Sequence, residues 1–416
     1  MKTKECRPRA FSWAFKWVMC VVLVTCTLAS GAGAISTEKV IYAFTGQSDG
    51  SDPSSPLTLD GQGNLYGEAS GGNGGYGVVF KLAPSLNGQW KEIPYYSFEG
   101  GSNGAYPTGG IVPDPNGTFF GVTAGGGAYS EGTVFELIPT SVRQSIVLYS
   151  FQEESNYGNN PNSLIRDQAG NLYGTTLTGG SQGLGTVFEL SPSSGGRWTY
   201  QEIFTFTYGG SYAQYGAYPY GALTMDAAGN LYGTTFEGGV YGDGAVFELS
   251  NTSHGWKESL LYNFTGGDNG DGPLAGVSFD SQGNLYGTTL YGGQDEVGTV
   301  FQLTPTRGAW VHQVLHSFTG GLDGGSPYYG SLALDAAGNL FGTTKYGGDA
   351  QLGTVFKLAR GRRSDKWKET VLHSFTGAPD GVNPIFGLVL DPAGNLYGTT
   401  PTGGTDQFGV VFEITP

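Results

Sequence analysis

A phrase close to Gly-Asn-Leu-Tyr-Gly-Thr-Thr recurs along the chain and limits the folds that the chain can adopt. Its last copy occupies residues 394–400 and is followed by Gly403-Gly404 and by Gly-Val-Val-Phe-Glu-Ile at 409–414. Successive copies lie 53 to 59 residues apart, and their first glycines are Gly63, Gly117, Gly170, Gly229, Gly283, Gly338 and Gly394. A fixed period in this range is typical of solenoids and propellers, in which similar units share their interfaces. We therefore expect the 416 residues to form one repetitive body rather than two or three separate domains.

Each copy divides into short segments rich in β-branched and aromatic residues. In the sixth copy these segments are 331–334, 340–344, 353–358 and 367–375, and the turn Asp-Ala-Ala-Gly-Asn joins the first two. Aspartate, glycine and asparagine suit tight turns, and glycine interrupts every helical period outside the N-terminus. Four antiparallel strands joined by short loops make one propeller blade. The sequence therefore predicts an all-β fold, a seven-bladed β-propeller of four-stranded antiparallel blades.

Two sets of repeated residues are interpreted as structural. An aspartate heads each tight turn, where its carboxylate can accept backbone hydrogen bonds; the set is Asp60, Asp114, Asp167, Asp226, Asp280, Asp335 and Asp391. In five copies the fourth segment holds a tryptophan with a phenylalanine eight residues later, which favours packing between blades. These pairs are Trp90 and Phe98, Trp198 and Phe206, Trp256 and Phe264, Trp310 and Phe318, and Trp367 and Phe375.

The two ends of the chain complement one another. The chain stops after the third segment of the seventh copy, whereas residues 38–46 match the fourth segment at 369–377 position for position. We expect the N-terminal segment to complete the last blade and turn a row of blades into a ring. Such a strand covers the hydrogen-bonding edge of the last blade, and we expect it to bury Val40, Tyr42 and Phe44.

The first 34 residues are typical of an export signal. Five basic residues precede or enter an apolar run from Trp17 to Leu28, and Ala32-Gly33-Ala34 offers a cleavage site. An uncleaved anchor and a lipoprotein signal at Cys26 are the alternatives, but the apolar run is shorter than the roughly 20 residues needed to span a bilayer. The predicted domains are a signal peptide at 1–34 and a propeller at 35–416, and we expect a secreted, extracellular protein.

Charge and cysteine content narrow the possible partners. Removing residues 1–34 from the chain's 20 basic and 35 acidic residues leaves 15 and 34, a net charge of −19. This charge repels nucleic acid and anionic membranes, so we expect neither partner, and no stable membrane insertion after cleavage. All three cysteines, Cys6, Cys20 and Cys26, lie in the signal segment. The sequence predicts no cofactor and no metal, and we expect a monomer.

Ligand binding is predicted on the face that carries the Gly-Gly loops and the links between blades, because loops on a rigid frame often hold binding residues. Tyrosine rings beside hydrogen-bonding groups suit a sugar, although such rings also pack loops onto blades. Asp268 and Asp271 could alternatively hold calcium or serve turns. The candidate ligand-binding residues are Tyr208, Tyr212, Tyr215, Tyr218, Tyr220, Asp268, Asp271, Tyr328 and Tyr329.

No sequence motif identifies a catalytic residue in this chain. Two Gly-x-Ser-x-Gly matches, at 100–104 and 179–183, lack the following helix of a nucleophile elbow. His316 and His373 occupy places that tyrosine holds in other copies, which favours packing. Paired carboxylates for glycoside cleavage could still meet from different blades. The first copy departs from the repeat, since Gly67-Glu68-Ala69-Ser70 replaces Gly-Thr-Thr.

The phrase Gly-Asn-Leu-Tyr-Gly-Thr-Thr, followed by Gly-Gly and Gly-Thr-Val-Phe-Glu-Leu, closely resembles the GloVer tandem repeat of bacterial "choice-of-anchor" proteins. The match covers 38–416 and is most complete at 170–190, 283–303 and 394–414. The resemblance implies export and a surface or extracellular location. Members often carry a C-terminal anchor, which this chain lacks after Pro416, so free secretion is expected. The resemblance implies no activity and no catalytic residues.

The function expected from the sequence is a secreted, non-catalytic propeller that binds an extracellular ligand such as a glycan or a cell-surface component. One alternative is an extracellular glycosidase or polysaccharide lyase that acts at the mouth of the central channel. Another is a structural protein of the cell surface or matrix.

Overall fold

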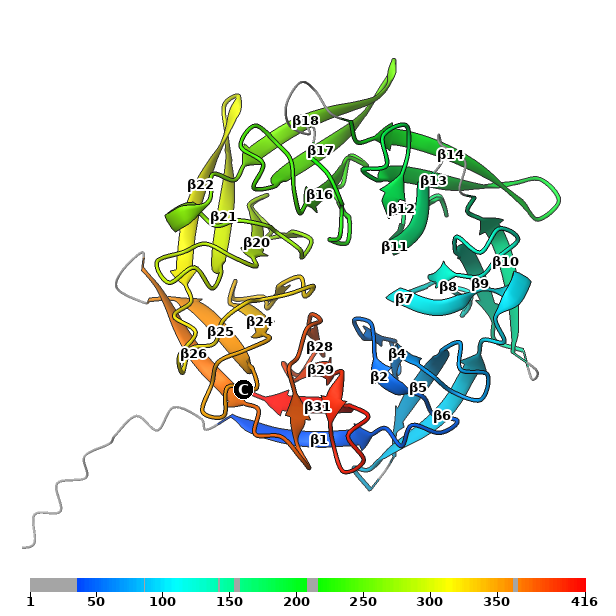
Figure 1. Ribbon diagram of the computed structural model, residues 1–416, viewed down its shortest axis with the longest axis horizontal. Coiled ribbons are helices and arrows are strands. Elements are labelled where there is room, and N and C mark those ends of the chain that lie inside the picture. Colours follow the sequence, from blue (N-terminus) through cyan, green and yellow to red (C-terminus); the bar gives the residue numbers. More distant parts are fainter. Residues whose placement is uncertain (1–35, 86, 141–142, 153–157, 208–215, 362–365) are drawn as a thin grey trace, which may run out of the picture. The chain divides into compact units, whose positions relative to one another are not determined.

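The computed structural model describes residues 36–416 except 86, 141–142, 153–157, 208–215 and 362–365. The predicted signal peptide therefore lies outside the described residues. Within 36–416, seven antiparallel sheets are arranged around a central axis, as the view down that axis shows (Figure 1). The predicted seven-bladed propeller of four-stranded blades is confirmed. Within the described residues, no helix is long and apolar enough to cross a membrane.

The blades are numbered 1 to 7 from the N-terminus. Within a blade, the strand nearest the axis is called the first and the outermost strand the fourth. First strands are β3 (Thr58–Leu59), β7 (Ala105–Pro113), β11 (Gly158–Arg166), β15 (Thr224–Met225), β19 (Ser278–Phe279), β23 (Ala333–Leu334) and β28 (Val389–Leu390). Second strands are β4 (Leu65–Ser70), β8 (Phe119–Gly125), β12 (Leu172–Gly179), β16 (Leu231–Thr235), β20 (Leu285–Thr289), β24 (Leu340–Thr344) and β29 (Leu396–Thr400).

The outer half of each blade is a long hairpin, except in blade 7. Third strands are β5 (Val78–Pro84), β9 (Thr133–Ile138), β13 (Thr186–Ser193), β17 (Ala245–Thr252), β21 (Thr299–Thr306), β25 (Thr354–Arg360) and β31 (Val410–Thr415). Fourth strands are β6 (Trp90–Ser97), β10 (Gln144–Ser150), β14 (Arg197–Thr205), β18 (Gly255–Asn263), β22 (Ala309–Ser317), β26 (Trp367–Ser374) and β1 (Thr37–Ala43). Short additions are β2 (Ser51–Pro53) on β4, the pair β27 (Gly381–Val382) and β30 (Thr402–Gly403), and the 3-10 turns η1 (Gly101–Asn103) and η2 (Gly267–Asn269).

A phenylalanine pair closes every interface between neighbouring blades. The phenylalanine after each fourth strand meets the phenylalanine of the next blade's third strand edge to face, with ring centroids 5.1–5.4 Å apart. All of these rings are completely buried. Such aromatic pairs add about 0.5–1.5 kcal/mol to the free energy of burial. The predicted packing of fourth-strand aromatic residues between blades is confirmed, and one set of contacts repeated seven times holds the ring together.

The tight turns use their aspartates as predicted. In blade 5, Asp280 accepts hydrogen bonds from the N–H groups of Gln282 and Asn284 at 2.8 and 2.9 Å, from the Asn284 side chain at 2.7 Å, and from the Tyr286 hydroxyl at 3.1 Å. Although partial burial raises the pKa of Asp280, these hydrogen bonds lower it below its ordinary value. The carboxylate thus satisfies polar groups of the turn instead of facing a ligand.

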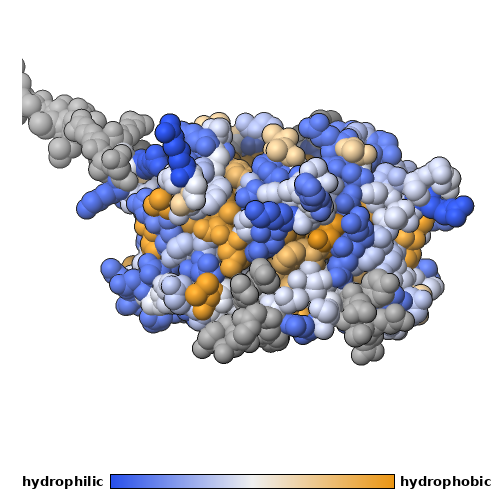
Figure 2. Space-filling view, turned by 90° about the horizontal axis from the view of Figure 1, so that it is seen from above, coloured by the Kyte–Doolittle hydropathy of each residue, from blue (hydrophilic) through white to orange (hydrophobic). Residues whose placement is uncertain are grey.

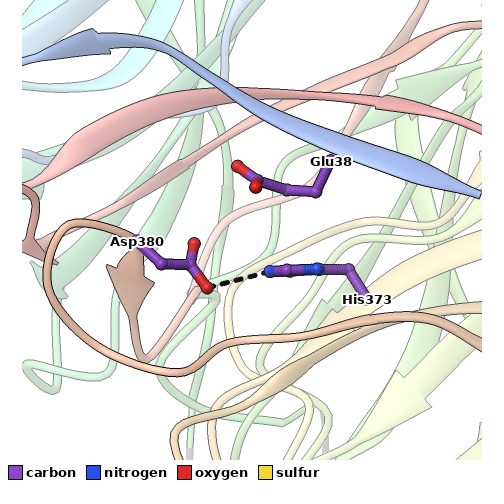
Figure 3. A group of neighbouring side chains, drawn as sticks. All are labelled: Glu38, His373 and Asp380. Atoms are coloured by element: carbon purple, nitrogen blue, oxygen red, sulfur yellow. Dashed lines mark hydrogen bonds and ion pairs between the residues drawn. The ribbon is translucent and has the colours of Figure 1, made fainter.

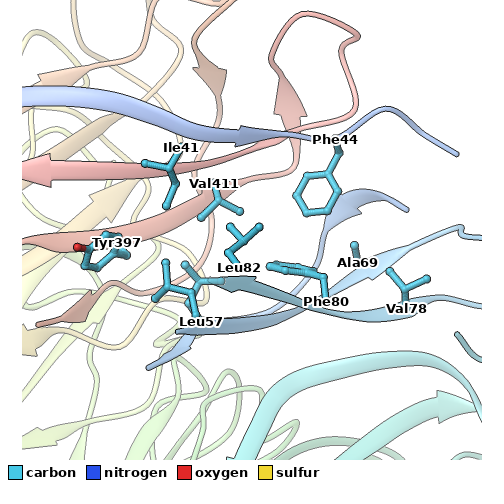
Figure 4. Close-up of a cluster of buried hydrophobic side chains, with 10 residues drawn as sticks. Ile41, Phe44, Leu57, Ala69, Val78, Phe80, Leu82, Tyr397 and Val411 are labelled. Carbon is cyan, nitrogen blue, oxygen red and sulfur yellow. The ribbon is translucent and has the colours of Figure 1, made fainter. Parts of the chain in front are cut away.

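The N-terminal strand closes the ring. Strand β1 pairs antiparallel with β31 and forms the outer strand of blade 7, so both ends of the described chain lie in one sheet (Figure 1). A β-bulge between Val40 and Tyr42 shifts the pairing by one residue. The bulge turns Ile41 inward, where it packs with Phe44, Phe80 and Val411 in the core between blades 7 and 1 (Figure 4).

The predicted closure is confirmed, but one predicted detail is wrong. Phe44 is fully buried as expected, whereas Val40 and Tyr42 are only partly buried and Ile41 takes the inner place. A strict alternation of inward and outward residues cannot foresee a bulge. On the side of the molecule that Figure 2 shows, apolar residues appear between hydrophilic ones.

Candidate functional site

The inner edge of the ring differs between the two halves of the protein. Five or six residues before the turn aspartate, blades 4, 6 and 7 carry the aromatic residues Tyr220, Tyr329 and Phe386. At the same two places blades 1, 2 and 3 carry Ser54-Ser55, Thr108-Gly109 and Pro161-Asn162. Large rings on one side of the axis and small or polar residues on the other leave space between them.

That space is a cavity of about 210 Å³ on the axis. Its wall comes from the links that enter the first strands and from the ends of second strands in blades 2 and 3, such as Ala124 and Leu177. These elements lie on the face of the Gly-Gly loops, as expected for a ligand site. The lining residues are Pro56, Thr108, Gly109, Ala124, Asn160, Pro161, Asn162, Ser163, Leu177, Tyr220, Ala222, Tyr329 and Phe386.

The aromatic wall is a connected group. The rings of Tyr220 and Tyr329 are 6.1 Å apart, and Tyr329 stacks against Phe386 with centroids 5.9 Å apart and planes at 23°. Their backbones are tied across blade interfaces: the Tyr329 N–H donates to the Ile385 carbonyl at 2.9 Å, and the Phe386 carbonyl accepts the Thr343 hydroxyl at 2.9 Å. These bonds hold the aromatic wall in place without any ligand.

The opposite wall supplies polar groups. Asn160 has a φ of +54°, a left-handed conformation that asparagine tolerates better than most residues. Its N–H donates to the Glu131 carbonyl of blade 2 at 3.1 Å. The Asn162 side chain donates to the Tyr220 carbonyl and so joins the polar wall to the aromatic one. Thr108 and Ser163 add hydroxyl groups to this wall, and the Ser163 hydroxyl lies 3.2 Å from the Thr175 hydroxyl.

A fully buried carboxyl group lies behind the cavity. Glu68 of β4 replaces the first threonine of Gly-Thr-Thr, and its Oε2 accepts the Gly110 N–H at 2.9 Å. Its Oε1 has no hydrogen-bond partner. Burial raises the pKa of Glu68 to about 8, although Gly110 and Ser55 act in the opposite direction. Gly110 and Ser55 each adjoin a lining residue, Gly109 and Pro56, so Glu68 supports the cavity wall as a neutral acid near pH 7.

Only some of the residues predicted to bind ligand line the cavity. Tyr220 and Tyr329 line the cavity, and Tyr328 packs edge to face on Tyr329. The Lys345 Nζ atom lies over the Tyr328 ring, 4.4 Å from its centroid. Tyr218 packs against the core between blades 3 and 4. Asp268 is exposed in η2, and Asp271 pairs with Tyr291 in the link between blades 4 and 5, so neither lines the cavity. Tyr208, Tyr212 and Tyr215 lie outside the described residues.

Sequence reasoning missed several lining residues, namely Phe386, Thr108, Asn160 and Asn162. Alignment of the copies on the turn aspartate places Phe386 near Tyr220 and Tyr329, and it shows that blades 1–3, and blade 5 with Leu274-Ala275, have no aromatic residue at these two places. The sequence shows that Glu68 departs from the repeat, but its burial depends on a contact with Gly110 of the next blade that the sequence does not display.

A second cluster lies at the ring closure. Glu38 of β1, His373 of β26 and Asp380 of the link between blades 6 and 7 bring their donor atoms within 4.8 Å of one another (Figure 3). His373 Nε2 is 3.0 Å from Asp380 Oδ2. Burial raises the pKa of Glu38, and the Asp380 charge raises it further. Although burial also raises the pKa of Asp380, hydrogen bonds from His373, Thr376 and Gly381 lower it overall.

The sequence of the repeat decides the family. A profile of the Gloeobacter/Verrucomicrobia repeat matches residues 27–163, 96–277 and 251–416, which together cover most of the chain. The chain belongs to the Gloeobacter/Verrucomicrobia repeat family. The expected resemblance is thereby confirmed, and in this member the repeat forms the blades of a propeller. No curated protein matches the sequence significantly.

Solved structures share the fold of this family member at low identity. A polysaccharide lyase of the ulvan lyase family PL25, bound to -[GlcA(1-4)Rha3S]-, is 13% identical over 90% of this chain and 95% of its own, with a TM-score of 0.53. PorZ, a bacterial surface component of the type-IX secretion system of Porphyromonas gingivalis, is 16% identical over 89% of this chain, with a TM-score of 0.51. This chain spans 47% of the PorZ chain.

A gluconolactonase from Xanthomonas campestris is 12% identical over 91% of this chain and 89% of its own, with a TM-score of 0.40. At these identities the matches to the ulvan lyase and to PorZ show the fold alone, and the match to the gluconolactonase carries no argument.

Proposed function

We propose that the protein is an exported, non-catalytic propeller that binds a neutral carbohydrate by seating one sugar ring in the axial cavity. The observation that carries the proposal is the composition of the cavity wall. Aromatic rings from blades 4, 6 and 7 face hydroxyl and amide groups from blades 2 and 3. A sugar has an apolar face that suits an aromatic ring and a rim of hydroxyls that suits hydrogen-bonding groups.

Size and charge restrict the ligand further. The cavity of about 210 Å³ is below the roughly 300–1,000 Å³ of most small-molecule sites, so it suits a single ring at the end or side of a glycan. Every lining residue is uncharged, and the chain as a whole is acidic. A sulfated or uronic acid ring would lack a positive partner here, which favours a neutral sugar.

The same wall favours binding over catalysis. Glycoside cleavage ordinarily uses two carboxyl groups on either side of the scissile bond, and no lining residue carries one. Glu68 engages Gly110 behind the wall. The predicted signal segment and the family membership support export.

A screen of the secreted protein on an array of neutral and acidic glycans, followed by calorimetry with the best neutral ligand, tests the proposal. Tyr220→Ala and Tyr329→Ala are expected to weaken binding at least tenfold, since each removes an aromatic surface on which the apolar face of a sugar can pack. The matched control is Tyr291→Ala, which removes a half-exposed tyrosine from the same face but not from the cavity. Equal affinities for all three variants would refute the site.

Assays on the same samples separate the alternatives. Release of reducing ends or of unsaturated products from the bound glycan would establish a hydrolase or lyase and refute a purely binding role. The absence of any ligand on the array would favour a structural protein. Tyr212, Tyr215 and Tyr218 were also predicted to bind, and a triple alanine variant with unchanged affinity would remove them from the site.

A further inference from the structure

The cluster at the ring closure is a group whose chemistry the proposed carbohydrate site does not use. Glu38 lies on the first strand of the chain, whereas His373 and Asp380 come from blade 6 and from the link that follows it. Figure 3 shows the Glu38 carboxylate on β1 directed toward the space beside Asp380 and the His373 ring. Residues more than 330 positions apart therefore meet where the ring closes.

We propose that Glu38, His373 and Asp380 bind one divalent transition-metal ion of the zinc class, which fastens the N-terminal strand to the neighbouring blade. The donor set is one imidazole nitrogen and two carboxylates, which zinc accepts, while calcium and magnesium prefer oxygen alone. Three protein donors also leave a coordination position for water.

The distances suit such an ion. Donor atoms at zinc–ligand distances of 2.0–2.2 Å lie roughly 3.4 Å apart in a tetrahedral site. His373 Nε2 and Asp380 Oδ2 are already 3.0 Å apart, and all three donors lie within 4.8 Å of one another. The three donors must move from within 4.8 Å of one another to about 3.4 Å to complete the set. On binding, the metal replaces the hydrogen bond between His373 and Asp380: the Nε2 lone pair goes to the metal and the neutral imidazole carries its proton on Nδ1.

The cluster holds one carboxylate in a fixed orientation. Oε1 of Glu38 is inaccessible to solvent and has no hydrogen bond, but the same is true of Oε1 of Glu92 and Glu369 at the neighbouring interfaces, so that atom does not single out the closure. Asp380 is held in place by backbone N–H groups, from Thr376 at 3.0 Å and Gly381 at 2.6 Å, which is how outer-shell groups orient a metal ligand. The side chains of His373 and Asp380 are 18% and 11% exposed, so an ion in solution can reach them.

The repeat provides internal comparisons. At the next interface the corresponding residues are Tyr42, Asp49 and Glu92, and the tyrosine hydroxyl instead donates to Asp49 at 2.9 Å. At the preceding interface they are His316, Asp323 and Glu369. Among the described residues, the donor atoms gather within 4.8 Å only at the closure. The structure therefore assigns the ion to one interface and provides a related cluster as control.

Calorimetric titration of the EDTA-treated full-length protein with Zn²⁺, and separately with Ca²⁺, tests the proposal. One Zn²⁺ per chain is expected to bind and to raise the melting temperature, because a ligand that binds the folded state stabilises it. Ca²⁺ is expected to bind at least tenfold more weakly. No stoichiometric Zn²⁺ binding, or Ca²⁺ binding of equal affinity, would overturn the assignment.

His373→Tyr is the decisive variant because tyrosine occupies the same place in other blades and leaves the packing on Phe375 intact. This variant and Glu38→Gln are expected to lose Zn²⁺ affinity at least tenfold and to lose the Zn²⁺-dependent rise in melting temperature. Glu369→Gln, in the related cluster, is expected to keep both. Zinc binding that survives His373→Tyr would place the ion elsewhere and contradict the proposal. If His373→Tyr lowers the melting temperature in EDTA, anomalous scattering at the zinc edge from wild-type crystals locates the ion, and a peak away from these residues overturns the assignment.

Discussion

Blades 2 and 3 and blades 4 to 7 have the same core but different inner edges. The first strands of blades 2 and 3, β7 and β11, each have nine residues, whereas those of blades 4 to 7 have two. The phenylalanine pairs between blades are the same in both regions. The comparison teaches that the repeated residues build the ring, while the residues that depart from the repeat shape the cavity.

The largest effects are expected where the two regions are alike. Phe188→Ala in blade 3 and Phe301→Ala in blade 5 each remove a fully buried ring and leave a cavity. Each is expected to lower the free energy of unfolding by about 3–5 kcal/mol. Urea denaturation measures both losses. A much smaller loss in blade 3 would break the claim of a common core.

Substitution of glycines at the inner edge should lower the free energy of unfolding by different amounts in the two regions, and by less than the loss of a phenylalanine. A Cβ on Gly109 or on Gly276 would lie 2.1 Å from a backbone oxygen of a neighbouring blade. Gly109 also has a φ of +79°. Gly276→Ala is expected to cost about 1–3 kcal/mol through the clash, and Gly109→Ala about 1–2 kcal/mol more through its conformation.

Gly308→Ala is the control for these glycine variants, since Gly308 has a φ of +92° but no atom within 4 Å of the added Cβ. This variant is expected to lose only the part of the free energy of unfolding that comes from the strained backbone conformation of alanine. The midpoint of thermal or urea unfolding measures that loss. A larger loss for Gly308→Ala than for Gly109→Ala would contradict the close approach of blades 2 and 3.

Glu68 should make the stability of the protein depend on pH. The threonines at the same position in other blades do not titrate and cannot have this effect. Burial raises the folded-state pKa of Glu68 to about 8, above the 4.5 of an exposed glutamate. Between these values the folded state keeps a proton that the unfolded state releases, so stability falls as pH rises from about 4.5 to 8. The slope is at most about 1.4 kcal/mol per pH unit.

Glu68→Gln should remove this slope and be the more stable protein at pH 8.5. Burial raises the pKa of Glu92, Glu258 and Glu369 to about 7, so these groups contribute mainly below that pH. Comparing melting temperatures at pH 7 and 8.5 therefore isolates Glu68. Parallel pH profiles for the wild type and the variant would show that Glu68 is ionised in the folded protein.

The smallest effect concerns the tight turns. In blade 2 the turn aspartate Asp114 forms a 2.7 Å ion pair with Arg166 of blade 3 through its Oδ2. In blade 5 the same oxygen of Asp280 accepts a hydrogen bond from the side chain of the turn asparagine, Asn284. Arg166→Gln is expected to cost about 1 kcal/mol, less at high salt. Asn284→Ala in blade 5 should cost a similar amount through lost hydrogen bonds, but without salt dependence. Urea denaturation at low and high salt distinguishes the two turns.

The sequence predicts the ring because the repeat acts locally. Each Asp-to-Asn turn and each fourth-strand phenylalanine has its role within one copy or between adjacent copies, and the match of 38–46 to 369–377 reveals the closure. The bulge that exchanges Ile41 for Val40 depends on the pairing with β31, which no single strand specifies.

The candidate sites were less predictable because they depend on differences between blades. Tyr220 and Tyr329 were chosen for their residue type, whereas Asn162 and Phe386 join them only through contacts across the axis. Asp268 and Asp271 lie in the link between blades 4 and 5, as the sequence predicts, but neither lines the cavity. The cluster of Glu38 and His373 requires the ends of the chain to meet, which residue spacing alone does not reveal.

One measurement tests most directly whether the departure of blade 2 from the aromatic pattern creates a binding cavity. Thr108→Tyr restores the tyrosine that blades 4 and 6 carry at the same place and fills the space opposite Tyr220 and Tyr329. Calorimetry with the neutral glycan selected on the array should show that binding is lost while the melting temperature of the variant stays close to that of the wild type. Unchanged glycan affinity in Thr108→Tyr would contradict the account.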